Sequence, residues 1–245
     1  MAKRDISGMY RQSLLGLLWS LVTPISTAAI WVLLKKSGTV AIVDTNINYV
    51  LYVFVGTMAW SIITESILGP INSTIGMKST LSKINFPKEA LILSSVYKTL
   101  FNSFIKLLIL IPLVLMYHQE INLYIFLFPL TVFVVFLFGT AIGLFITPIG
   151  LLYGDISRLL APVMQILMYI SPVVFMNPSL DTLYGKVMYF NPLSPLLNNF
   201  RNTILGLEMQ QINYYLLISF FSFILFSISL VFYRITIPII TERIS

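Results

Sequence analysis

Long uncharged runs of apolar residues constrain this chain more than any other feature of its sequence. A helix of roughly 20 apolar residues crosses a hydrocarbon core of about 30 Å. Of the 245 residues, 58% are hydrophobic and 10% are charged, whereas a soluble domain carries about 25% charged residues. We therefore expect an all-α integral membrane protein, because a helix satisfies its own backbone hydrogen bonds in lipid.

Six runs are candidates for membrane-spanning helices. Apolar length and the charged residues that end each run place them at about residues 14–34, 49–69, 92–117, 123–147, 159–177 and 210–233. On this assignment Glu65 sits in the last inner turns of the second span. The first run follows a polar segment and lacks a small-residue cleavage site, which indicates a retained span rather than a signal peptide.

The distribution of lysine and arginine predicts that both termini are cytoplasmic. With six spans, one side of the membrane receives Lys3, Arg4, Arg11, Lys78, Lys83, Lys88, Arg158, Arg234 and Arg243. The other side receives Lys35, Lys36, Lys186 and Arg201. Cytoplasmic loops carry the excess of positive charge, so the first side is the cytoplasm. The inner membrane surface then explains the formal charge of +6 better than nucleic acid does.

The stretch NPLSPLLNNFRNTILG, residues 191–206, belongs to an apolar segment at about residues 187–206 that is too short to span. Pro192 and Pro195 interrupt its helical hydrogen bonding. A broken segment at membrane depth must be buried in protein or line a wet cavity, because lipid cannot satisfy its backbone. We expect a re-entrant hairpin on the outer side; the alternative is an ordinary loop lying on the outer surface.

Polar side chains recur every fourth residue along the third span. Ser94, Lys98, Asn102 and Lys106 form one stripe on the helix. Lys106 lies about 12 Å deeper than Lys98, and a charge at that depth should face a cavity or a partner. The stripe is either the wall of a path for a polar or anionic solute, or part of a structural ion pair such as Lys98 with Glu65.

Aromatic residues make up 14% of the chain, and most should face lipid or lie at the membrane interface. Tyr49, Tyr52 and Trp60 on the second span are the candidates for lining a sugar path by stacking. The chain has no cysteine and one histidine, His118. A disulfide framework, a thiolate metal site and a zinc or haem site are therefore not expected.

Three cytoplasmic elements are candidates for docking a partner. Ile6, Met9, Tyr10 and Leu14 recur at near-helical spacing, which predicts an amphipathic interface helix at about residues 4–14. The loop GMKSTLSKINFPKEA carries three lysines, and the short loop YGDISR carries one acid and one base. The alternative for each is a solvated loop that only obeys the positive-inside rule.

Five stretches, in order along nearly the whole chain, resemble the permease subunit of ABC-2-type exporters of polysaccharides such as O-antigen and teichoic acid. They are RDISGMYRQSLLGLLWSLVTP, INFPKEAL, LLYGDISRLL, SPVVF and the stretch 191–206. The family usually has an arginine before the aspartate of the third stretch, where this chain has Gly154. The segment ahead of the first span is shorter than the resemblance leads us to expect.

The resemblance implies a single ABC-2-type transmembrane domain over residues 1–245, working as a homodimer with two ATPase subunits in the bacterial inner membrane. It implies that the cargo is a lipid-linked glycan. The residues expected to couple to the ATPase are Asp5, Tyr10, Arg11, Phe86, Pro87, Lys88, Glu89, Asp155 and Arg158. The expected outer gate comprises Ser171, Pro172, Asn191, Pro192, Pro195, Phe200 and Arg201. The expected translocation path comprises Tyr49, Tyr52, Trp60, Lys98, Asn102 and Lys106.

The sequence contains no G-x-x-x-x-G-K-[ST] phosphate loop, so we expect ATP and Mg²⁺ on a partner chain and no cofactor or enzyme activity here. One alternative is an ABC-2 exporter of a drug or small lipid. Another is a membrane-embedded transferase acting on lipid-linked sugars, which needs clustered acids or histidines, whereas the nine acids of this chain are dispersed. The intramembrane lysines argue against a third alternative, a purely structural membrane protein.

Overall fold

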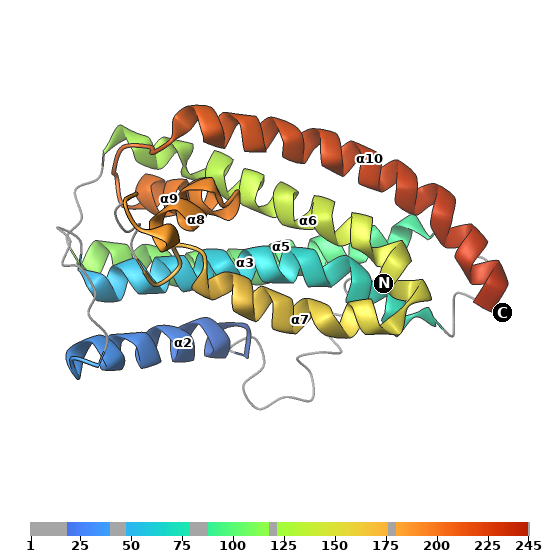
Figure 1. Ribbon diagram of the computed structural model, residues 1–245, viewed down its shortest axis with the longest axis horizontal. Coiled ribbons are helices and arrows are strands. Elements are labelled where there is room, and N and C mark those ends of the chain that lie inside the picture. Colours follow the sequence, from blue (N-terminus) through green and yellow to red (C-terminus); the bar gives the residue numbers. More distant parts are fainter. Residues whose placement is uncertain (1–18, 40–47, 79–87, 118–121, 176–179, 245) are drawn as a thin grey trace.

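The computed structural model describes residues 19–39, 48–78, 88–117, 122–175 and 180–244, and within them all regular structure is helical (Figure 1). The elements are α2 (Trp19–Lys36), α3 (Tyr49–Gly76), α5 (Glu89–Met116), η2 (Leu123–Leu127), α6 (Phe128–Leu152), α7 (Gly154–Tyr169), α8 (Leu183–Phe190), α9 (Leu193–Ile204) and α10 (Ile212–Ile244). The predicted interface helix at residues 4–14 lies outside the described residues.

Six long helices, α2, α3, α5, α6, α7 and α10, lie side by side and alternate in direction along the chain (Figure 1). The short helices α8 and α9 form a hairpin at one end of this bundle, which we call the hairpin end. α3, α6 and α10 begin at the hairpin end, and α5 and α7 begin at the opposite end, which we call the far end.

α3 is the central helix of the bundle, because α2, α5, α6, α7 and α9 all pack against it. Its close approach to α6 depends on Gly139 and Gly143, which lie one turn apart on α6. A Cβ at Gly139 would stand 2.6 Å from the Ser66 Cβ, and one at Gly143 would stand 2.4 Å from the Ile67 carbonyl oxygen. Small residues at this spacing let two helices in a membrane pack closely.

Four helical segments among the described residues are long and apolar enough to cross a membrane: α3, α5, η2 together with α6, and α10. α2 has 18 described residues and α7 has 16. At 1.5 Å per residue, α7 reaches only about 24 Å. The structure therefore indicates a multi-pass membrane protein, while six full spans with cytoplasmic termini stay a prediction.

The structure corrects the predicted end of the second span. α3 continues to Gly76, so Glu65 lies near the middle of the helix and not in its last turns. Sequence reasoning ended the span near this carboxylate because an isolated charge is costly in lipid. Glu65 is not isolated, since the Lys106 ammonium of α5 neutralises it, and the helix runs on.

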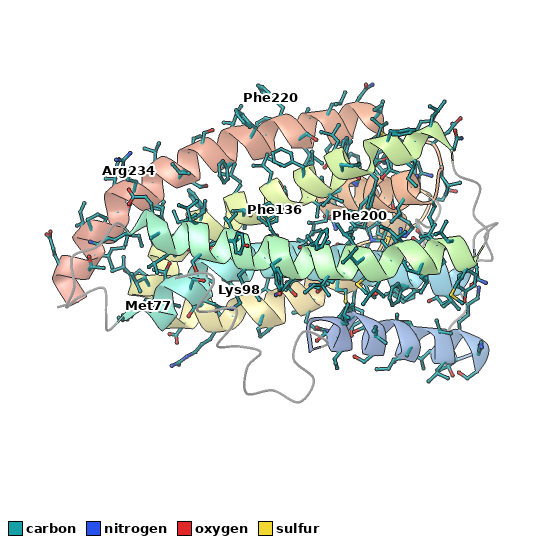
Figure 2. The ribbon with its side chains drawn as sticks, turned by 180° about the vertical axis from the view of Figure 1, so that it is seen from behind. Met77, Lys98, Phe136, Phe200, Phe220 and Arg234 are labelled. Carbon is teal, nitrogen blue, oxygen red and sulfur yellow. The ribbon has the colours of Figure 1, made fainter. Side chains whose placement is uncertain are left out.

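The fifth and sixth predicted spans also differ from the structure. α7 runs over Gly154–Tyr169 instead of 159–177, so YGDISR is mostly the first turn of a helix and not a loop. α10 runs to Ile244 instead of ending near residue 233. Arg234 lies on the surface of α10 near the far end and pairs with Glu89, so this charge does not end the helix (Figure 2).

Candidate functional site

A buried ion pair joins the middle of α3 to α5. Lys106 Nζ donates to Oε1 of Glu65 and, at 2.7 Å, to the hydroxyl of Ser61. Asn102 Nδ2 donates to Oε2 of Glu65 at 3.4 Å. The side chain of Lys106 is 0% exposed and that of Glu65 is 30% exposed. The two opposite charges therefore pair with each other, and Ser61 and Asn102 supply further hydrogen bonds, at a depth where lipid offers no hydrogen-bonding partner.

The predicted pairing of Lys98 with Glu65 is wrong, because Lys106 takes that place. α3 and α5 are antiparallel, so residues that approach one another run in opposite numerical order. Lys106 meets Ser61, Asn102 meets Glu65, and Thr99 packs beside Gly69. Lys98 therefore lies a turn closer to the far end than the carboxylate.

The first hollow is a cavity of about 330 Å³ between α2, α3 and α7. Its polar lining consists of Thr23, Thr27, Thr57, Ser61, Thr64, Glu65 and Gln165. Trp60, Pro24, Ala161, Met164 and Met168 supply the apolar part. Hydroxyls, an amide, a carboxylate and an indole ring thus share one cavity at the middle of the bundle.

The second hollow is a cavity of about 360 Å³ between α3 and α5. Its lining residues are Glu65, Leu68, Gly69, Asn72, Ser73, Ser95, Lys98, Thr99 and Asn102. Glu65 lines both hollows, so the ion pair forms a partition between them. Lys106 lines neither hollow and stands behind Glu65.

The predicted path residues do not share one cavity. Trp60 lines the first hollow, and Lys98 and Asn102 line the second. Tyr52 lies elsewhere: its ring is stacked under the guanidinium of Arg201, and its hydroxyl donates to the Phe175 carbonyl at 3.2 Å. Tyr49 lies under the Lys35 ammonium, which is 4.6 Å from the ring centroid.

Arg201 is the most constrained side chain of the hairpin. It is 1% exposed, and among the described residues no carboxylate pairs with it. Its Nη2 donates to the carbonyls of Pro172 at 2.8 Å and Val173 at 3.0 Å, and its Nε donates to that of Tyr52 at 3.2 Å. The three carbonyl dipoles and the Tyr52 ring, whose centroid is 3.6 Å from Arg201 Cζ, therefore stabilise the guanidinium charge. We call Arg201 with these partners the clamp. It joins α9 to the start of α3 and to the turn after α7.

The other predicted gate residues lie beside this clamp. Asn191 Nδ2 donates to the Ile170 carbonyl at 3.0 Å and to the Ser171 hydroxyl at 2.9 Å. Its Oδ1 accepts from the Leu193 backbone N–H at 2.9 Å, which caps α9. Phe200 is fully buried toward the hairpin end (Figure 2) and meets the Phe128 ring edge-on, with 5.1 Å between the ring centroids.

The two prolines of the hairpin mark the start of α9. Pro192 is the residue before the helix, and Pro195 is buried in its first turn, where a missing N–H costs no helical hydrogen bond. All residues of α9 are buried, polar ones included. Residues 193–205 are therefore packed inside the protein at the hairpin end, whereas Pro192 is exposed. The re-entry of this segment into the outer leaflet stays a prediction.

The predicted ATPase-coupling residues that the structure describes all lie at the far end. Lys88 Nζ donates to the Thr241 hydroxyl at 2.7 Å, and Glu89 pairs with Arg234 at 3.2 Å, which joins the start of α5 to α10. Asp155 and Arg158 are 90% and 84% exposed and 3.7 Å apart on the first turn of α7. Asp5, Tyr10, Arg11, Phe86 and Pro87 lie outside the described residues.

Sequence reasoning missed Ser61, Gln165 and Gly56. Ser61 and Glu65 are one turn apart on α3, and this spacing matches Asn102 and Lys106 on α5, so a search for facing polar pairs finds them. Gly56 carries no such signal. A Cβ there would stand 2.2 Å from the Val173 carbonyl oxygen and 2.4 Å from Arg201 Nη2, so only glycine leaves room for the clamp.

Comparison with known proteins identifies the family to which this chain belongs. The family model described as "ABC-2 type transporter" matches residues 1–205. The O-antigen export system permease protein RfbA of Myxococcus xanthus is 23% identical over 203 residues, covering 82% of this chain and 77% of the relative. Two proteins of the same name from Klebsiella pneumoniae are 22% identical over 207 and 219 residues. These matches cover 83% and 86% of this chain and 78% and 82% of the relatives. Since the family model spans well over half of a chain folded as a multi-pass helical bundle, this protein belongs to the ABC-2 type transporter family.

Proposed function

We propose that this chain is the permease subunit of an ATP-driven exporter that moves a lipid-linked polysaccharide from the cytoplasmic to the outer face of the bacterial inner membrane. Its relatives named O-antigen export permeases favour a glycan over a drug or small lipid as cargo. O-antigen, teichoic acid and capsule-like glycans belong to the same chemical class. The observation that carries the proposal is the lining of the first hollow.

The first hollow offers the groups that bind sugars. Threonine and serine hydroxyls, the Gln165 amide and the Glu65 carboxylate exchange hydrogen bonds with sugar hydroxyls. The Trp60 indole offers an apolar ring face on which the C–H face of a sugar ring packs. A hydrophobic drug does not need so many hydroxyl partners, and their burial would cost free energy without hydrogen bonds.

Two copies of the chain, each contributing one first hollow, enclose the path in this proposal. Two ATPase subunits dock at the far end, on the exposed Asp155 and Arg158 of α7 and on the start of α5. ATP binding closes the ATPases, and the resulting push on the far end shifts the helices as rigid bodies and opens the path.

The α8–α9 hairpin is the outer gate and re-enters the outer leaflet without crossing it. Its burial supports this role, because a short broken segment at membrane depth needs protein contacts in place of lipid. Opening the gate requires the Asn191 and Arg201 contacts to the turn after α7 to separate or to move together.

Transport by purified protein tests the proposal. The permease and its ATPase are reconstituted in vesicles with a lipid-linked glycan, and ATP-dependent exposure of glycan to an external glycosidase is measured. We expect Trp60→Ala to reduce export at least several-fold, whereas Phe220→Ala, a change on the outer surface of α10 (Figure 2), leaves it unchanged. Equal export by both variants, or ATP-dependent movement of small lipids without glycan, contradicts the proposal.

Single cysteines test the proposed orientation, because the chain has no cysteine of its own. Leu183 in α8 is 81% exposed at the hairpin end, and Tyr153 is 65% exposed at the far end. We expect a membrane-impermeant thiol reagent to label Leu183→Cys from the outside of intact cells and Tyr153→Cys only after lysis. The reverse pattern overturns the assignment of the hairpin to the outer side.

A further inference from the structure

The second hollow, between α3 and α5, has a chemistry different from that of the first. It contains no aromatic ring, and most of its lining residues are polar, with one ammonium among them. We propose that this hollow binds the phosphate-bearing head group of a membrane lipid. The isolated permease already has this site, so the inference does not rest on the export function.

Four hydrogen-bond donors of the second hollow have no partner among the described residues. They are the Lys98 ammonium, the Asn72 amide and the hydroxyls of Ser73 and Thr99. Many serine and threonine hydroxyls elsewhere in the bundle donate to a carbonyl one turn back, as Ser103 does to Thr99 at 2.7 Å and Thr74 does to Pro70 at 2.8 Å. Ser73 and Thr99 depart from this habit. Their protons are therefore available to an acceptor in the hollow.

The charges around the second hollow favour an anion. Glu65 lies at its inner end, but Lys106 neutralises that carboxylate from behind. Lys98 makes no ion pair within the described part of the chain, so the lining carries one uncompensated positive charge. A phosphate brings several acceptor oxygens and a negative charge, which four donors including an ammonium match. A neutral glycan leaves the Lys98 charge unmatched.

The depth of the second hollow corresponds to lipid head groups. At 1.5 Å per residue the 28 residues of α3 and of α5 each extend about 42 Å, roughly 12 Å more than a hydrocarbon core. Asn72 and Ser73 lie in the last turn or so of α3, at the far end. Lys98 lies about 14 Å from the start of α5, in the half nearer the far end (Figure 2), and its flexible stem reaches back toward the membrane surface. Asn72 and Ser73 therefore lie where the phosphates of one leaflet lie, and the Lys98 ammonium can reach that depth from below, whereas Thr99 lies deeper.

Native mass spectrometry of the purified full-length permease tests the inference with two matched lipid pairs. The pairs are phosphatidylglycerol with diacylglycerol, and a polyprenyl diphosphate with the same polyprenol. We expect at least one phosphate-bearing lipid to bind about tenfold more tightly than its phosphate-free counterpart. Phosphatidylglycerol would identify an ordinary membrane lipid as the ligand, and the polyprenyl diphosphate would identify a glycan carrier.

We expect Lys98→Gln to lower the affinity for the bound phosphate lipid about tenfold. Lys98→Arg keeps the positive charge and should retain most of the affinity. The matched control is Lys78→Gln, which removes an exposed charge near the same end outside the hollow. Ser73 is half-buried and lines the hollow, so Ser73→Leu fills the hollow without disturbing the core. We expect it to weaken lipid binding as much as Lys98→Gln does. The inference is overturned if neither phosphate lipid is preferred, or if Lys98→Gln and Lys78→Gln change affinity equally.

Discussion

Replacing Glu65 by leucine tests the ion pair that organises both hollows. The change leaves the Lys106 ammonium, which has no exposed surface, with the Ser61 hydroxyl as its remaining partner among the described residues. Removing one member of a buried pair costs about 3–5 kcal/mol, because the other charge stays buried without compensation. We expect Glu65→Leu to lower the free energy of unfolding by an amount in this range.

Lys106→Met should cost less, although it breaks the same pair. Glu65 keeps hydrogen bonds from Ser61 and Asn102 and is 30% exposed, so water in the hollows can solvate its charge. We expect a loss of about 1–3 kcal/mol, in the range for a polar group that loses a partner. The double variant Glu65→Leu/Lys106→Met leaves no charge behind and should lie within about 1 kcal/mol of the parent.

Unfolding in mixed micelles, followed by tryptophan fluorescence, measures all four proteins of this cycle. Two results would refute the reasoning: additive effects of the two changes, or a larger loss for Lys106→Met than for Glu65→Leu. Export assays on the same variants test the predicted place of Lys106 in the path. We expect Lys106→Met to reduce export while folding and ATPase binding are retained, and unchanged export would remove Lys106 from the path.

Other parts of the bundle give three further predictions. Gly56→Ala should lower the free energy of unfolding by about 3 kcal/mol or more, because the new Cβ would overlap the Val173 carbonyl and the Arg201 guanidinium. The control Gly76→Ala has open space around it and should leave the free energy of unfolding nearly unchanged in the same experiment. Arg201→Lys should lower the melting temperature of the purified protein, because one ammonium cannot reach all three carbonyls and stack on a ring; an unchanged melt contradicts the clamp. Asp155→Asn should leave stability within about 0.5 kcal/mol, since the pair with Arg158 is exposed, yet reduce the permease's effect on ATP hydrolysis by the partner; unchanged hydrolysis would remove Asp155 from the coupling surface.

Much of the architecture could be predicted from the chain alone, because lipid imposes a simple rule on it. Apolar length predicts helices, and α3, α5, α6 and α10 appear close to where the runs of the sequence lie. Pro192 and Pro195 predict an interrupted segment, and the helix α9 that follows Pro192 is buried throughout, while its re-entry into the outer leaflet stays a prediction. The stripe from Ser94 to Lys106 follows from helical spacing alone. Two of its members, Asn102 and Lys106, donate hydrogen bonds to Glu65, as expected of polar side chains at membrane depth.

The partners of these side chains were decided only by tertiary structure. Helical periodicity reports which residues share a face, but the register between antiparallel α3 and α5 decides whether Glu65 meets Lys98 or Lys106. That register depends on packing along the whole length of both helices, including contacts far from the charges. The same holds for Arg201, whose carbonyl partners come from α3 and from the turn after α7, far away in the chain. Backbone carbonyls exist at every residue and leave no mark in a sequence, so only the fold shows which of them hold a buried charge.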